Sequence, residues 1–241
     1  MADLNVISIF PSPLGVINFG EQSRELNRIL VKNIDEEKEK HQTESAKRTF
    51  SSNECSWQSD MNLEKYYDSF RLLRDLLSQI VIPCMTDCGY DHNFCREKIT
   101  VENLWANLIF DKGGWSTPHI HGSGNTLFTG VYYPKGLERI KNLDDFNRDD
   151  RDDFFKFANT LKNSDGHLVI LDPSRNIKSQ VRGSDNSLKP YPFYGANLFV
   201  KPRESLCVLF PAWLEHYVSP IIKKEKRYSI SFAVNKKENG E

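Results

Sequence analysis

Several features that would identify a class of function are scarce in this chain of 241 residues. Its 32 basic and 33 acidic residues give a formal net charge of −1. A balance this even, with the two signs interspersed, provides no strong field for nucleic acid or a membrane surface. No run of about 18 apolar residues occurs, and residues 1–10 lack a basic start, so neither a spanning helix nor a signal peptide is predicted. We therefore expect a cytoplasmic protein that binds neither nucleic acid nor membranes.

Cysteine is also sparse. The five cysteines are an odd number, in a chain long enough to fold without disulfides, which favours reduced thiols. Cys84, Cys88 and Cys95 lie near His92 in the sequence, but their spacings match no familiar zinc motif. We therefore expect ordinary packed thiols here.

The hydrophobic pattern has a helical period in the first hundred residues. Residues 63–80 carry the strongest stripe, with Asn62 as a candidate cap, and a shorter stripe begins near Glu21. The charged residues 35–48 indicate a fraying helix end and a loop. Residues 6–19, which are apolar but contain two prolines, predict an extended segment at a sheet edge.

From residue 104 onwards the period becomes that of strands. Short apolar runs separated by Gly, Pro and Asp predict strands at residues 104–110, 118–121, 127–133, 167–171, 197–200, 205–210 and 227–234. Strands that follow two helices without further βαβ alternation predict a mainly β fold with some α, an antiparallel double-sheet roll with helices on one outer face.

We expect a single domain, residues 1–241. Residues 1–100 would supply helical and edge-strand support, and residues 101–241 the β-roll core with an insert at about 140–165. The aspartate-rich stretch 140–162 indicates a surface helix or a lid; it lacks the glycine and the spacing of a calcium loop.

Three histidines in the β half suggest a metal centre. His119 and His121 are two residues apart, so on a strand their side chains point to the same face, and His216 lies far downstream. Together they can close three sides of a metal ion and leave its other positions free. This arrangement suits a non-haem iron that must bind a co-substrate and oxygen, whereas a structural zinc site is closed.

The last predicted strand has one polar face. Arg227, Ser229 and Ser231 alternate with apolar residues, so their side chains would point into a cavity. A guanidinium can grip a carboxylate with two hydrogen bonds, and the hydroxyl of Ser229 lies on the same face. The alternative, in which Arg227 pairs at the surface with Glu215 or Glu225, stays open.

Five segments, in this order along the chain, resemble the 2-oxoglutarate- and Fe(II)-dependent oxygenases of bacteria and phages. They are residues 104–107 (LWAN), 114–121 (GWSTPHIH), 129–133 (TGVYY), 209–216 (LFPAWLEH) and 227–232 (RYSISF). Residues 9–13 and 57–59 are similar too. The resemblance implies a double-stranded β-helix (jelly roll, cupin-like) flanked by N-terminal helices, an iron site at its mouth and 2-oxoglutarate as co-substrate.

The resemblance also implies roles for particular residues. His119, His121 and His216 are expected to be the catalytic residues that bind Fe(II), although the wider superfamily carries Asp or Glu at the second position. Whether His121 contacts the metal directly therefore stays open. Arg227 and Ser229 are expected to hold the distal carboxylate of 2-oxoglutarate.

Two further residues are assigned to the co-substrate, Asn107 and Tyr132. Because neighbouring side chains on a strand point to opposite faces, at most one of Tyr132 and Tyr133 can reach the cavity.

These expectations together favour a hydroxylase that uses Fe(II), 2-oxoglutarate and molecular oxygen on a C–H bond of a small polar molecule or a peptide. Two alternatives are left open. A three-histidine cupin thiol dioxygenase would need no 2-oxoglutarate, and a jelly-roll binding or virion protein would need no catalysis. The identity of the substrate, the oxidative outcome and the existence of a homodimer are not fixed by the sequence.

Overall fold

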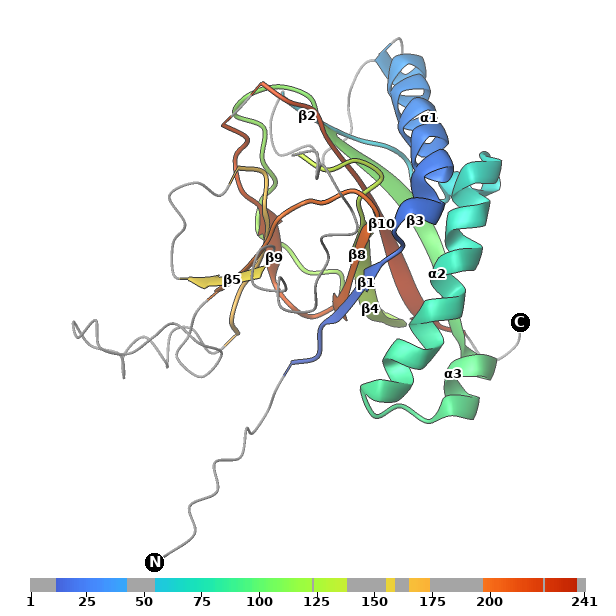
Figure 1. Ribbon diagram of the computed structural model, residues 1–241. Helices are drawn as coiled ribbons and strands as arrows, with labels where there is room; N and C mark the ends of the chain where they lie inside the picture. Colours follow the sequence, from blue (N-terminus) through green and yellow to red (C-terminus); the bar gives the residue numbers. More distant parts are fainter. Residues whose placement is uncertain are drawn as a thin grey trace, which may run out of the picture.

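The computed structural model describes residues 12–42, 55–122, 124–137, 155–158, 165–173, 197–222 and 224–237. Within these ranges the chain forms two antiparallel sheets, with helices against the larger one (Figure 1). The helical elements are η1 (Glu21–Ser23), α1 (Arg24–Gln42), η2 (Leu63–Lys65), α2 (Asp68–Asp87) and α3 (His92–Lys98).

The larger sheet has six strands in the order β1-β8-β4-β10-β3-β2, and the smaller has four in the order β5-β7-β6-β9. The strands of the larger sheet are β1 (Gly15–Asn18), β2 (Ser56–Gln58), β3 (Ile99–Ile109), β4 (Thr126–Tyr132), β8 (Leu206–Pro211) and β10 (Arg227–Lys236). Those of the smaller sheet are β5 (Phe155–Ala158), β6 (Leu168–Ile170), β7 (Asn197–Val200) and β9 (His216–Val218). Apolar residues of both sheets share one buried cluster, so the core of the roll lies between them.

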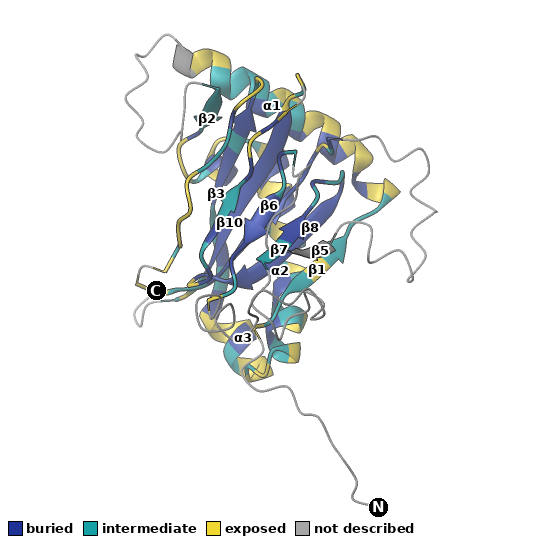
Figure 2. Cartoon of the chain, turned by 90° about the vertical axis from the view of Figure 1, so that its left-hand side faces the viewer, coloured by how far each residue is buried: buried dark blue, intermediate teal, exposed yellow. Residues whose placement is uncertain are grey.

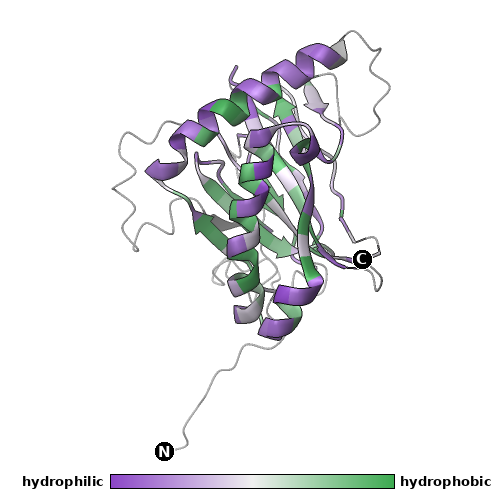
Figure 3. Ribbon diagram, turned by 90° about the vertical axis from the view of Figure 1, so that its right-hand side faces the viewer, coloured by the Kyte–Doolittle hydropathy of each residue, from purple (hydrophilic) through white to green (hydrophobic). Residues whose placement is uncertain are grey.

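The helices cover one face of the larger sheet, as predicted (Figure 3). In α2, buried apolar residues recur every three or four positions and pack with apolar residues of β3, β4 and β10. Figure 2 shows β8 and most of β10 buried, whereas the edge strands β1 and β2 are only partly buried and α1 and α3 carry exposed residues. The opposite face of this sheet is therefore the one that is available to a site.

The predicted helix boundaries need two corrections. Asn62 does not cap a helix through its side chain; its backbone is left-handed (φ 68°), and η2 with an extended Tyr67 separates it from α2. The helix α1 continues to Gln42, so the prediction of a fraying end is wrong for residues 35–42, where Asp35 accepts hydrogen bonds from Tyr228 and Lys226. Residues 43–48 lie outside the described ranges.

Two strand predictions also need correction. Residues 118–121 form no regular strand, only an isolated bridge between His119 and His216. Within residues 140–162, the stretch expected to be a helix or lid, residues 155–158 form the strand β5, which pairs with β7. The rest of this stretch lies outside the described ranges. The helix α3 and the short strands β1, β2 and β9 were not predicted as separate elements, although residues 6–19 were expected to be extended.

The thiol prediction is confirmed. All five cysteines lie in described ranges and none forms a disulfide. Burial raises the pKa of Cys84 to about 11 and also raises that of Cys88, so both thiols are protonated at neutral pH. No helix in the described part of the chain is long and apolar enough to cross a membrane.

Candidate active site

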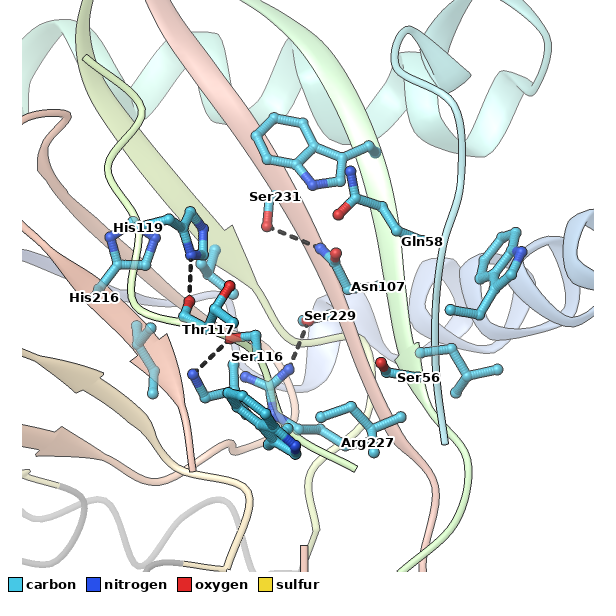
Figure 4. Close-up of a pocket in the computed structure, with 18 of the residues that line it drawn as sticks. Ser56, Gln58, Asn107, Ser116, Thr117, His119, His216, Arg227, Ser229 and Ser231 are labelled. Carbon is cyan, nitrogen blue, oxygen red and sulfur yellow. Dashed lines mark hydrogen bonds between the residues drawn. The ribbon is translucent and has the colours of Figure 1, made fainter. Parts of the chain in front are cut away.

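A pocket of about 470 Å³ lies on the face of the larger sheet that the helices leave open. Residues of both sheets and of the segment 115–121 line it. Figure 4 shows Arg227, Ser229 and Ser231 in a row along β10, with His119 and His216 across from them. The alternation predicted for this strand is thus confirmed.

The three histidines converge in this pocket. Each offers a ligand atom, and these atoms lie within 4.8 Å of one another. Backbone hydrogen bonds of 3.0 Å run in both directions between His119 and His216, and the amide of His121 donates to the carbonyl of Ala212 at 2.9 Å. These bonds give the segment the extended geometry that the prediction required of a strand, so both of its histidines reach the same side.

Two of the imidazoles have a fixed tautomer. Nδ1 of His119 lies 2.8 Å from the carbonyl of Thr117, and Nδ1 of His216 lies 2.9 Å from the carbonyl of Leu214. A carbonyl can only accept, so Nδ1 carries the proton and Nε2 presents its lone pair to the pocket. The ring of His121 has no hydrogen-bond partner among the described residues and packs 5.4 Å from the ring of Trp105.

Burial keeps the deeper histidines neutral. Burial, together with the neighbouring His119, lowers the pKa of His216 to about 3 and that of His121 to about 4. Because metal ligands must be deprotonated, these two imidazoles could bind a cation near neutral pH without first losing a proton.

The second feature of the pocket is a buried guanidinium. Arg227 is only 2% exposed. Its Nε donates to the carbonyl of Gly166 (2.8 Å), Nη1 to the hydroxyl of Ser229 (2.8 Å) and Nη2 to the phenol oxygen of Tyr133 (3.3 Å). All three acceptors are neutral, and no carboxylate of the described residues lies within ion-pair distance.

A buried cation without a counter-charge is costly. Burial lowers the pKa of Arg227, yet a guanidinium stays protonated in proteins. The alternative in which Arg227 pairs at the surface with Glu215 or Glu225 is therefore wrong. The guanidinium of Arg227 instead lines the pocket.

Of the two further residues assigned to the co-substrate, one lines the pocket and the other does not. Asn107 lines the pocket, where its Nδ2 donates to Ser231 at 3.1 Å. Tyr132 does not: it points towards the helices, where its hydroxyl donates to Asn27, so that assignment is wrong. The tyrosine on the pocket side of β4 is Tyr133, which does not line the pocket itself but contacts it through Arg227.

Strand register explains this error. Tyr132 pairs with Ile230, which faces the helices, and Val131 pairs with Ser231, which faces the pocket. Alternation then directs Tyr133 inwards. The sequence shows the alternation but not which residues pair across β4 and β10, so it could not decide between the tyrosines.

Comparison with known proteins shows which family the chain belongs to. A family model described as "Putative 2OG-Fe(II) oxygenase" matches residues 103–233, more than half of the chain. The chain belongs to this family. It is thus an enzyme that depends on Fe(II) and 2-oxoglutarate, as the sequence predicted. A search of curated proteins finds no match.

Solved structures share the fold at low sequence identity. A prolyl-4-hydroxylase from Pseudomonas putida has a TM-score of 0.53 and 10% identity, with 94% of each chain covered. A prolyl hydroxylase from Trichoplax adhaerens, in complex with a peptide of hypoxia inducible factor, has a TM-score of 0.51 and 15% identity, covering 92% of this chain and 83% of its own. HygX from Streptomyces hygroscopicus, with nickel and 2-oxoglutarate bound, has a TM-score of 0.50 and 12% identity, covering 93% and 83%. The prediction of a jelly-roll fold is confirmed.

Proposed function

We propose that this enzyme hydroxylates a C–H bond of a small polar molecule or a peptide side chain, with His119, His121 and His216 as the Fe(II) ligands. Arg227 and Ser229 bind the distal carboxylate of 2-oxoglutarate. One observation carries the proposal: three imidazoles that can meet a single cation share a pocket with a buried guanidinium that has no carboxylate partner.

The donor set fits iron. Imidazole is an accepted ligand of iron, and three protein ligands leave coordination positions for a co-substrate and oxygen. When bound at these histidines, Fe(II) would couple the reduction of O₂ to the oxidative decarboxylation of 2-oxoglutarate, with one oxygen atom going to succinate and the other to the hydroxylated C–H bond, and with carbon dioxide released. A third neutral ligand gives the centre one more positive charge than a carboxylate would.

The residues of the chain orient the co-substrate. The guanidinium of Arg227 is held in place by the carbonyl of Gly166 and by the hydroxyls of Ser229 and Tyr133, which leaves one further N–H group on each outer nitrogen for a carboxylate. The hydroxyls of Ser229 and Tyr133 accept from Arg227. Ser229, which lines the pocket, keeps its own proton to donate to the same anion. Asn107, which pairs with Ser229 across β3 and β10, is proposed as a further contact on this wall.

The remaining wall of the pocket is open to the primary substrate. It combines indole, amide and thioether side chains from β2, β3 and the segments that follow them: Trp57, Gln58, Met61, Trp105 and Trp115. Apolar surface with a few polar groups is typical of a site for a small molecule or a side chain. The peptide in the Trichoplax adhaerens structure belongs to that enzyme; it supports a peptide as one of the two substrate classes here.

Succinate formation tests this proposal. Protein loaded with Fe(II) under anaerobic conditions should form succinate from 2-oxoglutarate when oxygen is admitted, even as slow uncoupled turnover. Arg227→Gln should raise KM for 2-oxoglutarate by about 100-fold, because a charged hydrogen-bonded contact is lost. Arg71→Gln, a change at an exposed arginine of α2, is the matched control and should leave KM unchanged.

Other outcomes would favour the alternatives. Oxygen consumption with a thiol substrate, without any need for 2-oxoglutarate, would indicate a thiol dioxygenase. A biological function that survives His216→Ala and removal of iron would indicate a binding protein.

A further inference from the structure

The strand β3 contains a β-bulge beside the pocket. Ser231 of β10 pairs with Trp105. Two residues later along β10, Ala233 pairs with Glu102, three residues before Trp105. One extra residue of β3 is accommodated between these pairs, and Asn103 there has a left-handed backbone (φ 56°).

The bulge reverses which side chains face the helices. Before it, the odd-numbered Ile99 and Val101 belong to the cluster that packs against α1 and α2. After it, even-numbered residues such as Leu104 and Ala106 take this role. Side chains on a strand alternate between its two faces, so without the bulge Trp105 and Asn107 would face the helices. The bulge shifts the alternation by one residue and directs both side chains into the pocket.

A buried carboxylate holds the bulge. Glu64, on η2, is 3% exposed. Its Oε1 accepts from the amide of Asn103 and its Oε2 from the amide of Leu104, both at 3.0 Å. No cation among the described residues pairs with Glu64. The partners of its carboxylate there are the amides of Asn103 and Leu104. Leu63, 1% exposed, anchors the same turn in the core.

We propose that Glu64 is a positioning residue of the active site. By fixing the bulge it places Trp105 against His121, and it places Asn107 beside Ser231. Among the described residues the ring of His121, unlike those of His119 and His216, has no hydrogen-bond partner. Glu64 does not line the pocket and acts only through β3. This assignment rests on the proposed function for the roles of His121 and Asn107.

The conformation of Asn103 explains why a carboxylate is needed. A left-handed backbone is unfavourable for residues with a Cβ, although asparagine tolerates it better than most. A carboxylate offers two acceptor oxygens to two adjacent amides, which makes the bulge more stable than a regular strand at this point. An amide side chain offers one oxygen, and its NH₂ group would face an N–H donor.

Glu64→Gln, compared with Asn27→Ala, tests the proposal. Asn27 is also buried and hydrogen-bonded, to Tyr132 and Ser205, but it lies on the helix side of the sheet. Glu64→Gln should speed hydrogen exchange at the amides of residues 103 and 104 and weaken binding of Co(II), used as a probe for the metal, by about tenfold. It should also raise KM for 2-oxoglutarate. Asn27→Ala should lower Tm by a similar amount. It should leave hydrogen exchange at residues 103 and 104, Co(II) affinity and KM for 2-oxoglutarate within about twofold of the wild-type values, because a distant site that shares no partners with the pocket does not couple to it.

Changes at Asn103 separate positioning from general stability. Asn103→Gly, added to Glu64→Gln, should recover Co(II) affinity, because glycine adopts the left-handed backbone without a clamp. Asn103→Val alone should reproduce the loss with Glu64 intact. The proposal is overturned if Glu64→Gln lowers Tm while Co(II) affinity and exchange stay at wild-type values, or if Asn103→Gly gives no recovery.

Co(II) binding and hydrogen exchange need no turnover. If the wild-type protein forms no succinate, the proposed function fails, and these two readouts still decide whether Glu64 holds the bulge.

Discussion

The two faces of the larger sheet differ in how their buried polar side chains are paired. On the helix face, Tyr132 donates to Asn27, and Asn27 donates to Ser205, which also bonds to Ser23. These neutral groups satisfy one another. On the pocket face, Arg227 is buried with neutral acceptors and no counter-charge among the described residues. A satisfied network away from the pocket indicates a structural role, whereas an unmatched charge that lines the pocket, as Arg227 does, indicates a place for a ligand.

The largest effect is expected on the pocket face at the metal. His216→Ala removes a proposed ligand whose tautomer is fixed by the carbonyl of Leu214, and we expect no succinate above background and loss of stoichiometric iron. Iron analysis after anaerobic loading and a succinate assay measure this. His92→Ala, at an exposed histidine, is the control and should keep both. Full activity of His216→Ala would refute the proposed ligand set.

The second largest effect is expected from removing the unmatched charge of the pocket face. Arg227→Met replaces the unmatched buried charge by an apolar side chain of similar length, so the free energy of unfolding should stay the same or rise, by about 1–4 kcal/mol. KM for 2-oxoglutarate should rise by at least about 100-fold, because the guanidinium that pairs with the distal carboxylate of 2-oxoglutarate is lost. Chemical denaturation and steady-state kinetics give the two values. Strong destabilisation would show that Arg227 has a structural partner.

The third change exchanges a neutral ligand for a charged one. His121→Asp restores the carboxylate that the wider superfamily carries at this position, so iron binding should persist and the rate of succinate formation should stay within about tenfold. Loss of all iron would mean that the imidazole of His121, packed against Trp105, is indispensable as a ligand. His121→Ala is the companion variant and should bind iron more weakly than His121→Asp.

The smallest effect is expected on the helix face. Tyr132→Phe removes one hydroxyl from the network with Asn27 and should cost about 1–3 kcal/mol of stability, since a buried partner is left unsatisfied. KM for 2-oxoglutarate should not change. Tyr133→Phe is the matched comparison, since that hydroxyl contacts Arg227, and it should raise KM instead. The same KM for both variants would remove the distinction between the faces.

The sequence predicted the parts of the site that depend on local alternation. Histidines two residues apart and the polar face of β10 follow from the period of an extended chain, and both are found in the pocket. The helical stripe of α2 is likewise a local signal, and its packing against the sheet was predicted correctly.

Features that depend on pairing between distant segments were not predictable. The choice between Tyr132 and Tyr133 needs the register of β4 against β10. The bulge at Asn103 needs a carboxylate some 40 residues earlier in the chain. Residues 118–121 adopt an extended form through hydrogen bonds to the distant residues 212 and 216, and no local pattern contains these bonds.

The central claim is that one pocket holds a metal on three imidazoles and a dicarboxylate on a guanidinium. A crystal structure of the protein with Fe(II) and 2-oxoglutarate, prepared without oxygen, tests it most directly. We predict that Nε2 of His119 and of His216, with a ring nitrogen of His121, surround the iron, and that the distal carboxylate of 2-oxoglutarate accepts hydrogen bonds from Arg227 and Ser229. Iron bound at other residues, or a co-substrate that leaves Arg227 without an anion, would contradict it.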